Sequence, residues 1–156
     1  MEYLARVKEF HNQSVMQSTG AATGSESTDI EELQNSFGFV FPKAYIEYLT
    51  WMGKDYKGIF VGCNWFISDV LGNTELISEL LEENGVIFNL PKYYLGFFSH
   101  QGYMAAWFEL PVKSEDPEVW YYSEGSENKK PEIAGKFSDF LLKDMQSMAS
   151  CLQPKT

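Results

Sequence analysis

The sequence has a single arginine, Arg6, among its 12 basic residues. Arginine is the usual side chain for bidentate binding of phosphate, so its scarcity argues against a nucleotide or nucleic-acid site. Basic residues are also outnumbered, because 22 Asp and Glu against 12 Lys and Arg give a net charge of -10 at pH 7. An acidic surface repels nucleic acid and anionic lipid and attracts cationic proteins. We therefore expect no nucleic acid and no membrane among the partners.

Histidine and cysteine are also scarce, with two of each. His11 ends a predicted helix and His100 lies in a predicted turn, so a functional pair of histidines is not expected. Cys63 and Cys151 lack metal-ligand spacing and a neighbouring histidine, so no metal site is expected. Two reduced thiols are the favoured interpretation, with one disulfide as the alternative.

Recognisable catalytic and targeting motifs are missing as well. The sequence has no Gly-x-Ser-x-Gly, Walker loop, dinucleotide fingerprint or His-Glu-x-x-His. It also has no secretory signal pattern and no apolar run of membrane-spanning length. We therefore expect a cytoplasmic protein that is not an enzyme and uses no cofactor. Because carboxylates are abundant, an enzyme with an acid pair stays open as a further hypothesis.

The 156 residues, 44% of them hydrophobic and 16% aromatic, predict a single domain over 1–156 with a packed core. The order of predicted elements is helices, an antiparallel meander and a closing helix. This order predicts an α+β fold, with a central, mostly antiparallel β-sheet flanked by helices.

Apolar spacing and capping residues place the helices. We expect an amphipathic helix over 2–12, followed by a flexible loop over 13–27. Thr28 and Glu31 fit a capping box at the start of the next helix, and Gly38 fits its end. Pro42 fits the first position of a helix that runs to about Met52. Later helices are expected from Asp69, as N-cap, to about Asn84, and from Ser138 as N-cap with Phe137 and Leu142 as a hydrophobic staple.

Three segments are rich in β-branched and aromatic residues. We expect one or two strands over 58–67, a hairpin formed by 93–99 and 103–110 with Gly102 in its turn, and a strand over 118–122.

Acidic residues form two runs. Residues 58–91 contain five acids and no base, and residues 109–127 contain six acids and one base, Lys113. Such runs are either solvated surfaces or a negative surface for a basic protein, and aromatic residues beside them are either core or anchors. The candidate partner-binding residues are Asp69, Glu79, Glu82, Glu83, Glu115, Asp116, Glu118, Glu124, Glu127, Trp65 and Trp120.

Three short motifs resemble the SUKH superfamily of SMI-type cell-wall regulators and immunity proteins. The first is formed by Glu31, Leu33, Phe37-Gly38, Phe41-Pro42, Tyr45, Tyr48-Leu49 and Gly53. The second comprises Leu95-Gly96-Phe97-Phe98, Gly102 and Asp116-Pro117-Glu118-Val119-Trp120. The third is Phe137-Ser138-Asp139-Phe140-Leu141. One departure is Met52-Gly53-Lys54-Asp55, where the family often has Asn-Gly-Gly.

The resemblance implies a mixed sheet-and-helix domain without catalytic residues. Bacterial members of the family are typically immunity proteins encoded beside polymorphic toxins, and fungal relatives are largely regulators and scaffolds. The leading hypothesis is a bacterial immunity protein, or antitoxin, that binds a cognate and basic toxin, such as a nuclease, and occludes it. The alternative is a non-catalytic intracellular scaffold or regulatory binding module. For its own oligomeric state we expect a monomer or a weak homodimer.

Overall fold

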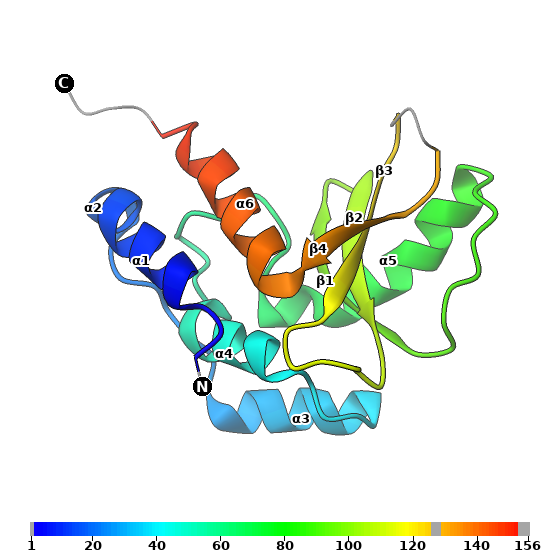
Figure 1. Cartoon of the computed structure of the whole chain (residues 1–156), viewed down its shortest axis with the longest axis horizontal. Helices are drawn as coiled ribbons and strands as arrows, with labels where there is room; N and C mark the ends of the chain where they lie inside the picture. The colour runs from blue at the N-terminus through cyan, green and yellow to red at the C-terminus, as the bar shows by residue number, and fades with distance from the viewer. Residues whose placement is uncertain (1, 126–128, 153–156) are drawn as a thin grey trace.

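A computed structural model describes residues 2–125 and 129–152. The described helices are α1 (Ala5–Ser14), α2 (Met16–Thr19), α3 (Ser27–Phe37), α4 (Lys43–Met52), the 3-10 helix η1 (Ile67–Asp69), α5 (Val70–Glu83) and α6 (Phe137–Ala149). The strands are β1 (Tyr94–His100), β2 (Met104–Glu109), β3 (Glu118–Ser123) and β4 (Glu132–Lys136). The fold is therefore α+β, as the order of predicted elements indicated (Figure 1).

The four strands form one antiparallel sheet in the order β1-β2-β3-β4. The predicted hairpin is confirmed as β1 and β2. Gln101 and Gly102 both have positive φ at its turn, which is the geometry of a type I′ turn and matches the twist of the two strands. The predicted strand over 118–122 is confirmed as β3. Strand β4 was not predicted, because its sequence Glu-Ile-Ala-Gly-Lys has few strand-favouring residues.

Alternate residues of β2 face opposite sides of the sheet, as strand geometry requires. Ala105 and Trp107 pack with Ile77, Leu80 and Leu81 of α5. The intervening Ala106 and Phe108 belong to a larger cluster that includes α4 and α6. In Figure 1, α6 accordingly lies to the left of the sheet, whereas α5 runs behind the sheet and to its right.

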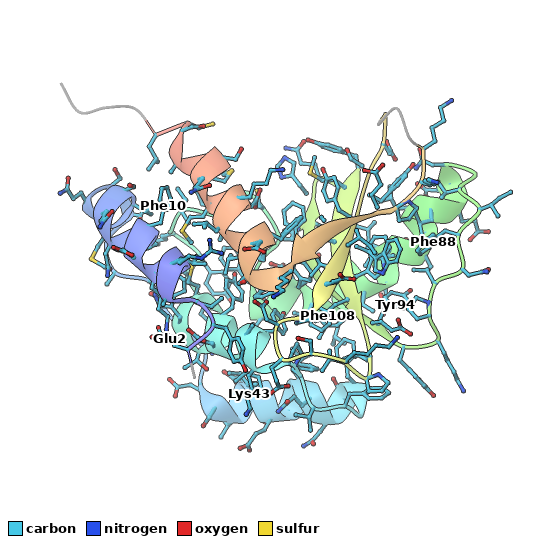
Figure 2. The ribbon with its side chains drawn as sticks, viewed as in Figure 1. Glu2, Phe10, Lys43, Phe88, Tyr94 and Phe108 are labelled. Atoms are coloured by element: carbon cyan, nitrogen blue, oxygen red, sulfur yellow. The ribbon has the colours of Figure 1, made fainter. Side chains whose placement is uncertain are left out.

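The larger cluster is dominated by aromatic rings. Phe97 lies 5.1 to 6.4 Å, between ring centroids, from Tyr45, Trp65, Phe108, Phe137 and Phe140. The β1–β2 register shifts between Gly96 and Phe98, and Phe97 and Phe98 both join this cluster. Figure 2 shows Phe108 near the centre of the molecule and Phe88 on the side of α5.

Gly96 marks the closest approach of β1 to α5. A Cβ atom at this position would lie 2.8 Å from the backbone carbon of Asn73 and 2.9 Å from the nitrogen of Thr74. The space is used instead by a hydrogen bond from the Gly96 N–H to Thr74 Oγ1, 2.9 Å long. Only glycine permits this separation of strand and helix.

The N-terminal segment differs from the expectation. The helix predicted over 2–12 is confirmed as α1, but it continues to Ser14, and α2 follows within the segment expected to be a loop over 13–27. Val15 between them is fully buried. The Ser25 N–H donates to the Leu49 carbonyl, 2.8 Å away. Tertiary contacts therefore order this segment, although its polar sequence contains no pattern that predicts a helix or a strand.

Several predicted helix starts are shifted. Helix α3 begins at Ser27 with Glu26 as N-cap and no side-chain capping bond, so the capping box of Thr28 and Glu31 is wrong. Its end at Gly38, in the left-handed conformation, is confirmed. Pro42 is the N-cap of α4 instead of its first residue, and the predicted end of this helix at Met52 is confirmed.

Helix α6 begins at Phe137, so the prediction that Ser138 is an N-cap is wrong. The Ser138 N–H and hydroxyl donate to the two carboxylate oxygens of Asp116, at 3.0 and 2.6 Å. Asp116 lies far from Ser138 in the sequence. Its carboxylate satisfies a backbone N–H in the first turn of α6, as a local N-cap side chain would otherwise do.

Residues 58–67 do not form a strand in the named sheet, so that prediction is wrong. They form turns, with one isolated bridge from Asn64 to Ser99, and run into η1. The apolar residues of the segment are nonetheless in the core, including Phe60 and Trp65. Positive φ at Gly62 breaks the extended conformation there.

Candidate partner-binding surface

The outer side of α5 is acidic. Val70, Ile77, Leu80 and Leu81 are buried on its inner side, which leaves the remaining positions facing away from the sheet. Its exposed acids are Glu75, Glu79, Glu82 and Glu83, and the helix sequence contains no basic residue. Three of the predicted partner-binding residues therefore share one exposed surface.

A hollow of about 360 Å³ lies beside the first half of α5. Its lining includes the acids Asp69, Glu75 and Glu79 and no basic residue. The floor is polar and internally satisfied, because the Ser99 hydroxyl donates to Asn73 Oδ1 at 2.6 Å and Asn73 Nδ2 donates to the Asn64 carbonyl at 2.9 Å. We call this the α5 hollow; its shape and charge suit a cationic side chain.

Asp69 is the most constrained of these acids. It is half-buried just before α5, and its carboxylate accepts the Phe66 N–H at 3.1 Å. Burial raises its pKa, and the hydrogen bond from Phe66 opposes that shift. The predicted position of Asp69 as N-cap of α5 is confirmed, but its side chain caps the preceding η1 instead of α5.

Tertiary structure joins the two acidic runs at the end of α5. Asn84 Nδ2 donates to Glu124 Oε1 at 3.0 Å. Glu82 and Glu83 immediately precede Asn84, so Glu124 of the second run continues the acidic surface of the first. We define the α5 acidic surface as Asp69, Glu75, Glu79, Glu82, Glu83 and Glu124.

Three other predicted residues of the second run, Asp116, Glu118 and Trp120, line a separate hollow of about 460 Å³. Glu118 and Trp120 line it together with Lys113, Lys136 and the exposed Ile133. Its charge is mixed, unlike that of the α5 hollow. Trp120 is partly buried, because its ring packs 5.1 Å from the ring of Phe88.

Two predicted acids of this run already have partners within the chain. Both Asp116 oxygens accept hydrogen bonds from Ser138, so this carboxylate organises α6. Glu115 lies 3.8 Å from Lys43 Nζ, and both side chains are well exposed. An exposed pair at this distance adds little to stability and leaves Glu115 accessible.

Trp65 is not a surface anchor, which corrects that prediction. Its side chain is fully buried, and the indole N–H donates to Asp144 Oδ2 at 2.7 Å. The rings of Phe60 and Phe98 lie 4.9 and 5.3 Å away. An aromatic residue beside an acidic run therefore belongs to the core here. Glu127 lies outside the residues that the structure describes.

One cysteine does have a histidine neighbour, contrary to the expectation from sequence spacing. Cys63 Sγ lies 3.4 Å from His100 Nδ1. Burial raises the pKa of the Cys63 thiol, and the Asp144 charge adds to this effect, so the thiol stays protonated and is a poor nucleophile. Cys63 and Cys151 are both free thiols, as the favoured interpretation predicted.

Within 2–125 and 129–152, no group of three or more His, Cys, Asp or Glu residues could hold a metal ion. Among the same residues no helix is long and apolar enough to cross a membrane. Three acids, Asp69, Glu75 and Glu79, line the α5 hollow.

Comparison with known proteins identifies the family. The model of the SMI1 / KNR4 family (SUKH-1) matches residues 24–143, which is most of the chain. The chain therefore belongs to this family, as its three motifs indicated. Members are generally non-catalytic immunity or regulatory proteins. No curated protein matches the sequence. Helices α1 and α2 precede the matched range.

Proposed function

We propose that this chain is a bacterial immunity protein that binds a cognate polymorphic toxin in the cytoplasm and neutralises it. The observation that carries the proposal is the α5 acidic surface, with its hollow free of basic residues, on a member of the SUKH-1 family. The toxin would be basic, and a nuclease fits because its substrate cleft must attract phosphate.

Occlusion of the toxin's active site, or of the path to it, is the proposed mechanism. The backbone of a packed helix is ordered before the partner arrives, so little ordering of the backbone is needed on binding. Opposite charges on the two proteins accelerate their encounter at low salt. A lysine or arginine of the toxin would enter the α5 hollow between Asp69, Glu75 and Glu79.

The primary test is binding to the protein encoded by the adjacent gene, measured together with protection of cells that express it. The double variant Glu79→Lys/Glu82→Lys should lower the association rate at low salt by about tenfold or more, because it reverses charge on the contact surface. Its matched control is Glu31→Lys/Glu32→Lys on exposed positions of α3, which changes the net charge equally. The control should retain most of the association rate.

Each outcome has a distinct meaning. If both double variants lose the same fraction of the association rate, net charge explains the effect. That result would contradict a specific role for the α5 acidic surface. Association that is unchanged between low and high salt would contradict the electrostatic mechanism. If the neighbouring product is neither bound nor neutralised, the immunity function is wrong, and the scaffold or regulatory module takes its place.

A further inference from the structure

His11 is a fully buried side chain on α1 whose two ring nitrogens have no hydrogen-bond partner. Its ring meets Trp51 of α4 edge to face, with 5.3 Å between the centroids. A neutral imidazole without partners already costs desolvation free energy, and an imidazolium in the same place would cost more. Burial accordingly lowers the pKa of His11 below its usual 6.5, and the charge of Asp55 opposes this shift.

The charged groups around His11 are engaged elsewhere. Asp55, which follows α4, accepts the Thr23 N–H at 3.2 Å. On α1 itself, Lys8 lies over the Trp51 ring at 5.8 Å and pairs with Glu47 of α4 and with Glu2. On α6, Asp139 pairs with Arg6 at 2.6 Å. Helix α2 contributes no titratable residue. None of these groups forms a hydrogen bond with the His11 ring nitrogens.

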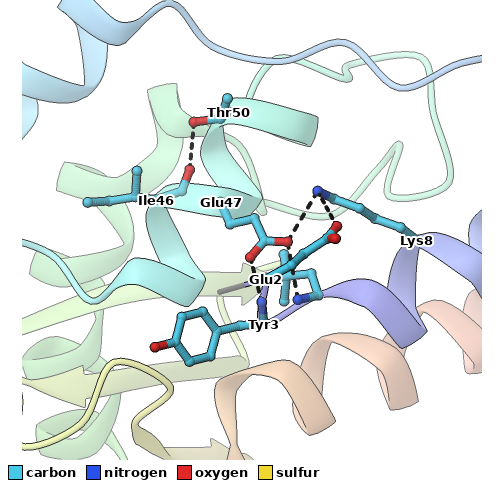
Figure 3. A network of polar contacts seen from close by, with 7 residues as sticks. Glu2, Tyr3, Lys8, Ile46, Glu47 and Thr50 are labelled. Carbon is cyan, nitrogen blue, oxygen red and sulfur yellow. Dashed lines mark hydrogen bonds and ion pairs between the residues drawn. The ribbon is translucent and has the colours of Figure 1, made fainter.

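Glu47 of α4 ties the start of α1 to the rest of the chain (Figure 3). Glu47 accepts the N–H groups of Tyr3 and Leu4, at 2.8 and 3.2 Å, and so caps the start of α1 from another helix. Leu4, Val7 and Val15 are buried in the large hydrophobic cluster, and Tyr3 and Phe10 pack against it. The segment also lies before residue 24, where the family match begins.

We propose that α1 and α2 form a latch that acid releases, with His11 as the proton-sensitive group. Protonation of the ring favours arrangements in which α1 has left α4 and α6, because only there can water satisfy both N–H groups. Release uncovers the apolar residues that Leu4, Val7 and Val15 cover. The latch therefore controls access to the surface formed by α4 and α6, which is separate from the α5 acidic surface.

The direction of the pH dependence follows from proton linkage. The undocked state has the higher His11 pKa and binds the proton more strongly than the docked state. Docking is therefore fully present above about pH 6.5 and weakens as the pH falls toward the pKa of the docked state. One proton changes the docking equilibrium by at most about tenfold per pH unit across that window.

Hydrogen exchange of the full chain tests the proposal between pH 7.5 and 5.5, after correction for the intrinsic pH dependence of exchange. Protection of α1 amides should fall below pH 6.5, by at most about tenfold per pH unit, whereas amides of β1 and β2 should keep their protection. The His11 ring resonance, one of two histidines in the chain, should titrate below 6.5 in the same samples.

Two variants sharpen the result. His11→Phe keeps an aromatic ring at Trp51 and cannot be protonated, so α1 protection should become independent of pH. His100→Asn removes the other histidine and should leave the wild-type dependence intact. The proposal is overturned if wild-type α1 protection does not change with pH, if β1 and β2 lose protection in parallel, or if His11 titrates at or above 6.5.

Discussion

One face of the sheet packs against a large aromatic cluster that includes α4 and α6, whereas the other packs against α5 and the segment that follows it. The first cluster interlocks the rings of Tyr45, Trp65, Phe97 and Phe137. The second is smaller and has one buried tryptophan, Trp107, among mainly aliphatic residues. Stability is thus concentrated on the first face, and the second carries a helix whose outer side is free for binding.

The difference between the two faces of the sheet predicts the largest loss of stability for Phe97→Ala. Phe97 is fully buried and contacts rings from several elements, so its loss should reduce the free energy of unfolding by about 3–5 kcal/mol. The counterpart on the other face, Ile77→Ala, should cost about 2–3 kcal/mol, because the smaller cluster lies nearer the surface and collapses more readily. Denaturant unfolding measures both. An Ile77 variant at least as damaging as the Phe97 variant would contradict the comparison.

An intermediate effect is expected where α5 meets β1. Gly96→Ala places a Cβ atom against the α5 backbone at Asn73 and Thr74 and should cost about 1–3 kcal/mol by overpacking. Gly72→Ala is the matched control, because no atom lies within 4 Å of a Cβ atom at that exposed position of α5. It should stabilise the protein by about 0.5 kcal/mol. If both variants have the same midpoint in thermal unfolding, close contact at Gly96 does not hold α5 in place.

The smallest effect on stability is expected on the outer side of α5. Glu79 is exposed and lies two residues from the buried Ile77. Glu79→Gln should change the free energy of unfolding by less than about 0.5 kcal/mol, while it lowers the salt-dependent part of toxin association. A larger loss of stability would show that Glu79 has a structural role. The outer side of α5 would then contribute to folding, and the contrast between its packed side and its binding side would be wrong.

Sequence patterns predicted most helices and the hairpin, because hydrophobic spacing and turn residues act over a few positions. Gly38 and Gly102 are examples, since positive φ at each is a local requirement. The predicted capping box at Thr28 and the predicted N-cap at Ser138 are wrong, because a local pattern does not decide where these helices begin. Backbone donors at the start of α6 are satisfied by Asp116, and nothing within a few residues of Ser138 indicates that contact.

The candidate surface was predicted in part. Glu79, Glu82 and Glu83 are exposed on one helix side, as their spacing and the buried residues between them require. Trp65 was assigned wrongly, because an aromatic residue in an irregular segment carries no periodic signal that distinguishes core from surface. The contact of Cys63 with His100 and that of His11 with Trp51 could not be predicted from the sequence either, since each contact joins distant parts of the chain.

The sequence by itself determined the acidity of this protein, its α+β order of elements, the motifs of its family and the absence of a recognised catalytic motif. These properties depend on composition and on residues close together in the chain. Only the tertiary structure decided which acids share a surface, which aromatic residues are core and what surrounds each histidine. Those outcomes depend on contacts such as Asn84 with Glu124 and His11 with Trp51, which form only when the sheet and its helices pack.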